Sequence, residues 1–156
     1  FRGGRGDGDA VFLPLFPKVL SRKRISERGP WSEWLNQKGS DIIRIDRRLS
    51  VNHEFNVFSR FYFNADSFPE ITKRPLAALD GVNLKEILGS VFNMPLTNVE
   101  QCVSLVKFAP EICKAIGAKT GTQGMLLQSA SSAGRGNPIY FLESFIPPNS
   151  RQLDFS

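Results

Sequence analysis

Cysteine and histidine are scarce in this sequence: its 156 residues include two cysteines, Cys102 and Cys113, and one histidine, His53. Two cysteines cannot form the disulfide framework of a small secreted domain, and with one histidine they do not supply the four ligands of a structural zinc site. Both cysteines lie in strand or helix patterns, where cysteine behaves as a small core residue, and His53 lies in a predicted turn. We therefore expect no catalytic residues, no metal site and no cofactor.

Long apolar runs are also missing. No segment approaches the ~20 consecutive apolar residues that cross a bilayer, and no charged-then-apolar signal segment opens the chain. Hydrophobic residues make up 41% and charged residues 22% of the sequence, which is typical of a globular chain and not of a disordered one. A chain of this length fits one domain, so we expect a single globular domain in the cytoplasm.

Two glycine-bearing motifs lack the residues that would make them ion or nucleotide sites. Asp7-Gly8-Asp9 is too short for a calcium loop and is not followed by the bidentate glutamate that closes one. Residues 121–124 read Gly-Thr-Gln-Gly, but no Lys-Ser/Thr pair follows them. The second motif therefore predicts a turn and not a phosphate loop.

Positive charge is concentrated on the N-terminal side. Residues 1–48 hold 11 Lys or Arg against 6 Asp or Glu, whereas residues 49–156 hold 9 against 9, so the first third accounts for the net charge of +5. A basic segment can face nucleic acid, but Arg22-Lys23-Arg24 beside a strand is more typical of a solvated sheet edge. Residues 1–9 are rich in glycine and charge and predict a flexible tail or linker remnant. Because the chain begins with Phe1 and not Met, we expect that a segment precedes it.

Segments rich in Val, Ile, Phe and Tyr predict a sheet-rich domain over residues 10–156. Pro14 and Pro17 make the first segment an irregular or edge strand, and the polar link 51–53 between the second and third is typical of a hairpin. The predicted strands are 10–20, 41–50, 54–63, 99–108, 124–132 and 139–146. Hairpin connections imply antiparallel pairing, and together with the helices below they predict the α+β class.

Three segments carry helix signals. Pro30 suits the first turn of a helix, and the apolar side chains that follow share one stripe: Trp31, Trp34 and Leu35. Pro110 and Gly117 are the start and stop signals of another short helix. After a proline-bounded loop over 66–75, apolar side chains at helical spacing over 83–93 predict an amphipathic helix lying on the sheet.

The order and spacing of several motifs resemble one family of bacterial regulators from about residue 18 to residue 155. A strand of the form v-x-R-x-x-R is matched by residues 42–47, and a strand ending in an aromatic residue by 57–63. Later matches are the f-P loop at Phe68-Pro69, the S-L-Y-x-x-L helix start at 83–88, the A-x-x-L-G-v-x-x-G turn at 115–121 and the closing p-G-S-R-Y at 147–151. This pattern resembles the UTRA effector-binding domain of GntR-type transcription regulators of the HutC branch.

The resemblance implies a chorismate-lyase-like fold, in which a bent antiparallel sheet and flanking helices surround a pocket. It implies transcription regulation by a homodimer, with DNA bound only through an N-terminal winged helix-turn-helix domain that this chain lacks. The partner is a small-molecule effector, an organic acid or a sugar derivative. Four positions depart from the family pattern: Leu49, Asn83, Lys85 and Gln152. Leu49 replaces the second arginine of an R-x-R pair, which argues against a phosphorylated ligand.

Six residues are candidate ligand contacts: Arg47, Arg60, Asn83, Lys85, Tyr140 and Ser144. A pocket for a small anion needs buried donors, and the planar guanidinium of arginine grips a carboxylate with two hydrogen bonds. Arg47 shares a strand face with Ile45 and Leu49, whereas Arg44, Asp46 and Arg48 on the other face predict a wet surface. The resemblance adds weight to Arg47 and to the polar residues of the last strand.

Each candidate also has a structural interpretation. Arg47 and Arg60 could form salt bridges with Asp46, Glu54 or Glu143, since an unpaired charge in an apolar strand is costly. Asn83 could be a helix N-cap, a role that still leaves N–H groups free for an anion. Tyr140 and Ser144 could simply pack in the core.

Two functions of different classes fit the sequence. The first is an effector-sensing domain of a regulator, and the second is a chorismate-pyruvate-lyase-like enzyme of the same fold. A binding domain that never had a DNA-binding half is a third possibility. The closing Ser150-Arg151 pattern and the turn around Gly117 favour the regulator, so we do not expect an enzyme.

Overall fold

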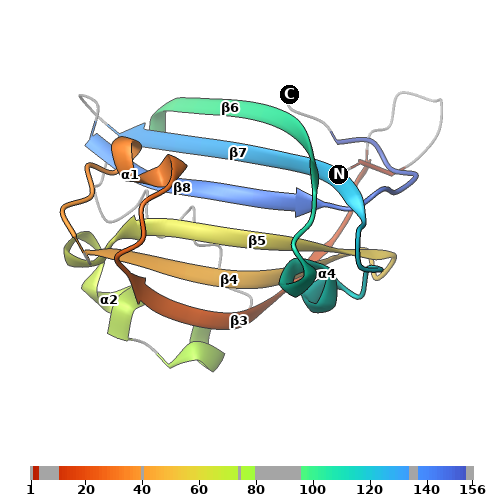
Figure 1. The fold of residues 1–156 in the computed structure, drawn as a ribbon, viewed down its shortest axis with the longest axis horizontal. Coiled ribbons are helices and arrows are strands. Elements are labelled where there is room, and N and C mark those ends of the chain that lie inside the picture. The colour runs from red at the N-terminus through yellow and green to blue at the C-terminus, as the bar shows by residue number, and fades with distance from the viewer. Residues whose placement is uncertain are drawn as a thin grey trace.

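Six strands form one antiparallel sheet in the order β3-β4-β5-β8-β7-β6 (Figure 1). The computed structural model describes residues 2–3, 11–39, 41–73, 75–79, 96–133 and 137–153. The strands of the sheet are β3 (Leu15–Ile25), β4 (Ile42–Val51), β5 (Phe55–Asn64), β6 (Leu96–Lys107), β7 (Gln123–Ala133) and β8 (Asn137–Ile146). The predicted strands and the α+β class are confirmed, although several strands extend beyond the predicted ends.

The first strand shows the largest shift from its predicted position. Pro14 precedes β3, and the basic run Arg22-Lys23-Arg24 continues the strand. β3 lies at an edge of the sheet and is irregular between Val19 and Ser21, as its prolines predict. Lys23 and Arg24 are exposed, which agrees with a solvated edge.

Part of the N-terminal segment is also described. Within the predicted tail, Arg2–Gly3 (β1) pairs antiparallel with Val11–Phe12 (β2). The rest of residues 1–9 lies outside the described ranges, so the tail stays a prediction.

The hairpin between β4 and β5 sets the register of the centre of the sheet. Asn52 and His53 both have left-handed backbone angles, with φ of 51° and 57°, and the pairing runs from Val51 opposite Phe55 to Ile42 opposite Asn64. Asparagine and histidine are enriched in this conformation, which gives a tight reversal the hand that suits twisted strands. The hairpin predicted around residues 51–53 is confirmed.

Two short helices pack on one face of the sheet, at opposite ends of its strands (Figure 1). α1 (Pro30–Trp34) places the Trp31 ring on the Tyr62 ring, with centroids 4.2 Å apart and planes 8° from parallel. α4 (Pro110–Ile116) packs on β5 and β8 and ends at Gly117, whose φ of 74° explains why glycine ends the helix. Both helices were predicted by their proline starts.

The segment predicted as a loop over 66–75 is partly helical, so that prediction was wrong. It holds the 3-10 turn η1 (Ala65–Ser67) and the helix α2 (Pro69–Lys73), followed by η2 (Leu76–Leu79). Pro69 suits a first helical turn, and Ile71 is buried against the sheet. The helix is stabilised by this packing, since five residues are too few for propensity alone to predict it. The amphipathic helix expected over 83–93 lies outside the described residues.

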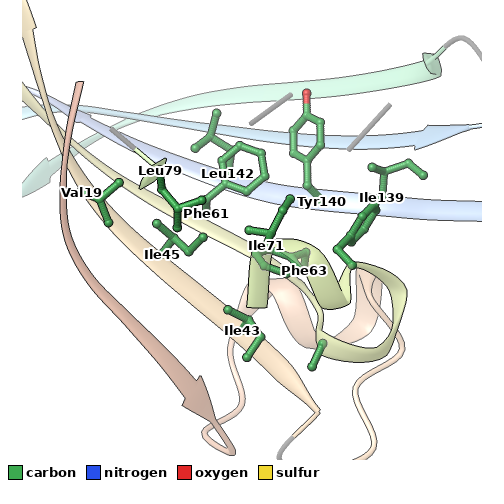
Figure 2. Packing of buried hydrophobic residues seen from close by; sticks show 12 residues of the cluster. Val19, Ile43, Ile45, Phe61, Phe63, Ile71, Leu79, Ile139, Tyr140 and Leu142 are labelled. Carbon is green, nitrogen blue, oxygen red and sulfur yellow. The ribbon is translucent and has the colours of Figure 1, made fainter. Parts of the chain in front are cut away.

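The core is divided by the sheet into two layers. One layer gathers under α2 and η2 and is shown in Figure 2: Val19, Ile43, Ile45, Phe61, Phe63, Ala65, Phe68, Ile71, Leu79, Ile139, Tyr140 and Leu142. The other layer lies under α1 and α4 and includes Ile42, Tyr62, Phe58 and Phe145. We call these the α2 face and the α1 face. In the described ranges no helix is long and apolar enough to cross a membrane.

Candidate functional site

A row of directly paired residues crosses the α2 face at the middle of the sheet. Arg47 on β4 lies opposite Ser59 on β5, Ser59 lies opposite Ser144 on β8, and Ser144 lies opposite Leu127 on β7. Side chains that lie opposite one another in an antiparallel pair project from the same face. The row therefore brings together two of the predicted contacts, Arg47 and Ser144, with Ser59 between them.

Arg47 is buried, and the described residues offer it no ionic partner. Only 8% of the residue is exposed, and its guanidinium carbon lies 5.7 Å from the centroid of the Phe61 ring. Among the described residues, no carboxylate forms an ion pair with Arg47, and its Nε has no hydrogen-bond acceptor. Burial lowers the pKa of Arg47 from 12.5 to about 10, so the side chain is still charged at neutral pH. The cation is held in an apolar layer in which its Nε meets no acceptor from the described residues.

Ser59 is a functional candidate that the sequence interpretation missed. Its residue is fully buried and its Oγ has no hydrogen-bond partner within the described ranges. A buried hydroxyl or guanidinium without a partner costs ~1–3 kcal/mol, and here the two lie opposite each other. The signal was present: Ser59 is a lone hydroxyl on the strand face that Phe61 and Phe63 make apolar.

Tyr140 lies on the same face, two pleats along β8 from Ser144. The register shifts between Ser131 and Ser132, and both Ile139 and Tyr140 belong to the α2-face cluster. The Tyr140 ring packs 4.9 Å from that of Phe61, and Figure 2 shows its hydroxyl at the outer end of the ring, away from Ile43. Burial raises the pKa of Tyr140, so the phenol is neutral at physiological pH. Tyr140 therefore adds an aromatic ring to the face that carries Arg47, Ser59 and Ser144.

Arg60 projects from the opposite face of the sheet. It lies opposite Asp46, with its Nε 3.5 Å from Asp46 Oδ1 and its Nη2 donating to Glu111 Oε1 of α4 at 3.2 Å. Burial acts to lower the pKa of Arg60, but the charges of Asp46 and Glu111 outweigh it and raise the pKa above its ordinary value. The structure therefore does not bring Arg60 together with Arg47. The ion pair with Asp46, one of the structural alternatives, is what forms.

The prediction of a solvated surface around Asp46 was wrong as well. Asp46 is only 7% exposed, and Arg44 Nε lies 3.1 Å from its Oδ1. Arg44 and Arg60 therefore flank a buried carboxylate, and Arg60 also contacts Glu111 of α4, which packs against β5. Alternation along β4 separated the two faces correctly but could not show that α4 covers the polar one.

A second polar group on the α1 face was also missed. Glu143 is 7% exposed, and its two carboxylate oxygens accept hydrogen bonds from Tyr62 Oη at 3.0 Å and Gln128 Nε2 at 3.2 Å. Burial and the neighbouring carboxylate of Glu143 raise the pKa of Tyr62, which keeps it a donor. Each carboxylate oxygen of Glu143 thus has a donor within the sheet, and these hydrogen bonds stabilise it.

The closing Ser150-Arg151 motif has a structural role. Arg151 donates from Nε to Glu54 Oε2 at 2.8 Å and from Nη2 to Glu54 Oε1. This two-pronged pair ties the C-terminal segment to the β4–β5 hairpin. Beside it, a groove of about 520 Å³ opens along the ends of β6, β7 and β8. Its lining includes Leu105, Met125, Ile146 and Lys107.

Two predicted contacts, Asn83 and Lys85, lie outside the described residues and stay predictions. No group of three or more His, Cys, Asp or Glu side chains gathers as metal ligands would in the part of the chain that the structure describes. The polar row can therefore offer an incoming anion a guanidinium and hydroxyl groups, but it offers no acid–base pair and no nucleophile with an adjacent base.

The UTRA domain family model matches residues 17–151 of the chain, which includes the whole main sheet except the first two residues of β3. This chain belongs to the UTRA family. UTRA domains are the effector-binding, non-enzymatic part of GntR-family transcription regulators, so the enzyme alternative is set aside. No protein of curated function matches the sequence.

Solved UTRA-type structures share the fold at low sequence identity. The C-terminal domain of the histidine utilization repressor from Pseudomonas syringae is 16% identical over 92% of this chain and 98% of that one, with a TM-score of 0.75. The effector domain of PhnF from Mycobacterium smegmatis is 12% identical over 86% and 82%, with a TM-score of 0.74. The C-terminal domain of YurK from Bacillus subtilis is 22% identical over 83% and 88%, with a TM-score of 0.71. Against PhnF as a whole, the match spans 59% of that protein. These likenesses establish the UTRA fold for the present sheet and helices.

Proposed function

We propose that this UTRA domain senses a small organic anion that binds on the α2 face, with its negative group on Arg47. The observation that carries the proposal is the buried Arg47 guanidinium, charged and without an ionic partner among the described residues, opposite the unpaired Ser59 hydroxyl. Burying a charge this way is costly unless a counter-charge arrives. An anionic effector supplies that counter-charge and accepts hydrogen bonds from Arg47 and Ser59.

The composition of the row favours one class of anion. One guanidinium and the hydroxyls of Ser59 and Ser144 suit a carboxylate, while the aromatic rings of Phe61 and Tyr140 suit a flat or apolar body. Leu49 stands where a second arginine would strengthen a phosphate site. An organic acid is therefore the first candidate effector, ahead of a sugar phosphate. Asn83 and Lys85 would complete the site from the segment that follows η2.

Occupancy of the site controls DNA binding in this proposal. The regulator acts in the cytoplasm as a homodimer, and effector and operator each prefer one of two arrangements of the paired domains. The two binding events are then coupled, and each changes the affinity for the other by the same factor. DNA is contacted by a winged helix-turn-helix domain outside this chain.

The test begins with a thermal-shift screen of the chain against dicarboxylates, urocanate-like acids and sugar phosphates. Calorimetry with any hit then compares the wild type with Arg47→Ala and Arg48→Ala. A charge-assisted contact is worth ~1.5–3 kcal/mol, so Arg47→Ala should weaken binding roughly 10- to 100-fold. Arg48 lies next to Arg47 on β4 but projects from the α1 face, so its loss should change affinity little.

Equal affinities of the wild type and Arg47→Ala would remove Arg47 from the site. If the arginine were only structural, its loss would lower the melting temperature and leave the ligand-induced stabilisation unchanged at a matched excess of ligand. Tight binding of sugar phosphates with no binding of carboxylates would contradict the assignment of the effector class.

A further inference from the structure

Positive charges gather on the α1 face where β3 pairs with β4. Lys18 on β3 lies directly opposite Arg48 on β4. Lys23 lies directly opposite Arg44 in the same pair of strands. Arg44 and Arg48 alternate with the α2-face residues of β4 and project from the α1 face, and residues that lie opposite one another share a face. All four cations therefore lie on the α1 face, and we call them the cation strip.

The cation strip contains little negative charge. β3 and β4 together hold seven Lys or Arg against one carboxylate, Asp46. Asp46 lies between the two cation pairs, but it is buried and close to both Arg44 and Arg60. Arg48 forms no ion pair with a carboxylate of the described ranges. Like charges directly opposite each other destabilise a sheet, so these two pairs act against the fold.

Protection of the sheet edge accounts for only part of this charge. Charged side chains on an edge strand stop it from pairing with another chain. β3 is an edge strand, so Lys18 and Lys23 can serve that purpose. Arg44 and Arg48 lie on β4, which is paired on both sides and has no edge to protect. The cations of the inner strand therefore add repulsion without protecting the edge, and they indicate an anionic partner.

The cation strip is accessible and extended. Lys18 and Lys23 are exposed, and Arg44 and Arg48 are half-buried. The helices of this face, α1 and α4, pack at opposite ends of the strands (Figure 1). Four residues along a strand span about 14 Å and neighbouring strands lie about 5 Å apart, so the two cation pairs mark the ends of a long, narrow strip. A surface of this shape suits an extended polyanion, since a small anion would reach only one pair.

We propose that the cation strip binds the phosphate backbone of duplex DNA beside the operator, without reading its sequence. The inference rests on the proposed function in one respect: a winged helix-turn-helix domain outside this chain holds the DNA nearby. A tethered partner has a high effective concentration, so contacts too weak to hold free DNA still contribute. Phosphates of one strand follow each other every 3.4 Å along the helix axis, so a strip about 14 Å long can meet several of them.

A salt series of fluorescence anisotropy with a labelled duplex of arbitrary sequence tests the strip. The logarithm of the association constant of the wild-type chain should fall linearly with the logarithm of the salt concentration. The double variant Lys18→Gln/Lys23→Gln removes two phosphate contacts, so the slope should decrease by about 2 and the affinity at low salt should fall about 10-fold or more. Arg48→Gln, on the inner strand, should decrease the slope by about 1.

The matched control removes the same charge elsewhere. Lys73→Gln/Lys107→Gln replaces two exposed lysines, one in α2 and one at the end of β6, and should keep the wild-type slope. Urea denaturation checks the fold of each variant. Lys18 and Lys23 each face a cation, so their double variant should unfold at the wild-type urea concentration or above it.

Three outcomes would overturn the inference. The first is an unchanged salt slope in both Lys18→Gln/Lys23→Gln and Arg48→Gln. The second is an equal loss of affinity in the control, because DNA would then respond to net charge and not to the strip. The third is binding of the wild type to vesicles of anionic phospholipid with no binding to the duplex, which would assign the strip to a membrane surface.

Effector binding separates this inference from the proposed function. Arg47 projects from the α2 face and Arg48 from the α1 face, so stabilisation by an organic acid should be the same in the wild type and in every strip variant. Loss of DNA association with unchanged effector binding supports the strip. Failure of every organic acid to stabilise the chain would contradict effector sensing, while the salt slopes would still decide the strip.

Discussion

Arg47 and Ser59 lie directly opposite each other on β4 and β5, both buried, and neither Arg47 Nε nor Ser59 Oγ has a hydrogen-bond partner among the described residues. One residue along, Asp46 and Arg60 form an opposite pair of unlike charges, with Arg60 Nε 3.5 Å from Asp46 Oδ1. Two adjacent cross-strand pairs thus differ in their chemistry: one joins opposite charges, and the other holds a cation and a hydroxyl for which the described residues show no acceptor.

Replacing Arg47 by methionine should not cost stability in the absence of effector. The substitution removes an unpaired buried charge and keeps most of the side-chain volume, so the free energy of unfolding should be unchanged or rise by about 1–2 kcal/mol. Urea denaturation measures this. Ile45→Ala, on the same strand face and fully buried, is the contrasting variant and should lose about 2–5 kcal/mol. A marked loss of stability in Arg47→Met would mean that a structural partner of Arg47 exists.

Replacing Ser59 by alanine should separate stability from binding. The variant loses a buried hydroxyl that has no partner, so the unfolding free energy should stay within about 1 kcal/mol of the wild type. Effector affinity should fall about 3- to 10-fold if the hydroxyl bonds to the ligand. Calorimetry with the hit from the screen measures the affinity, and an unchanged value would remove Ser59 from the site.

Arg60→Ala should behave in the opposite way. Its loss leaves the buried Asp46 with Arg44 alone and detaches Glu111 of α4, which should destabilise the fold by about 1–3 kcal/mol. Effector affinity should not change, because Arg60 projects from the α1 face. A variant that binds effector weakly while unfolding at the wild-type denaturant concentration would contradict this assignment.

The pair of Arg151 and Glu54 should make stability depend on acid pH. The hydrogen bonds from Arg151 lower the pKa of Glu54 from 4.5 to about 2. A carboxylate with a lowered folded-state pKa contributes stability above its ordinary pKa, and that contribution is lost as pH falls from 4.5 towards 2. The melting temperature of the wild type should therefore exceed that of Arg151→Gln at pH 7, and the difference should shrink as pH falls below 4.5 and disappear near pH 2. A difference that persists at low pH would show that the guanidinium acts through packing and not through the carboxylate.

The chain by itself should not bind duplex DNA with sequence selectivity. The helices in the described ranges have five to seven residues, and none is followed by a recognition helix of the helix-turn-helix type. Fluorescence anisotropy at physiological salt should show only weak, salt-sensitive association, since the net charge of +5 is modest. Nanomolar binding to one sequence over others would refute this.

Local patterns predicted most of the fold. Alternation and turn residues located the six strands, and Pro30, Pro110 and Gly117 marked the two helices of the α1 face. The alternation also placed Arg47 on the apolar face of its strand. It could not predict whether Arg60 on β5 projects from the same face as Arg47. That depends on the number of residues in the hairpin turn, because a shift of the register by one residue exchanges the two faces.

Tertiary contacts explain what the sequence could not show. α2 is held by the burial of Ile71, and the polar group around Asp46 includes Arg60, which contacts Glu111 of the distant helix α4. Ser59 became a candidate only when the register set it opposite Arg47. Neither packing from a distant segment nor strand register is encoded in a single stretch of sequence.

The position of α1 gives the molecule an optical reporter. Both tryptophans of the chain, Trp31 and Trp34, are in α1, and Trp31 stacks on Tyr62 on the face of the sheet opposite to Arg47. A ligand on the α2 face cannot quench either indole by direct contact. When the bound acid does not absorb in the near ultraviolet, a change in tryptophan emission would therefore report a structural change that crosses the sheet, separately from occupancy.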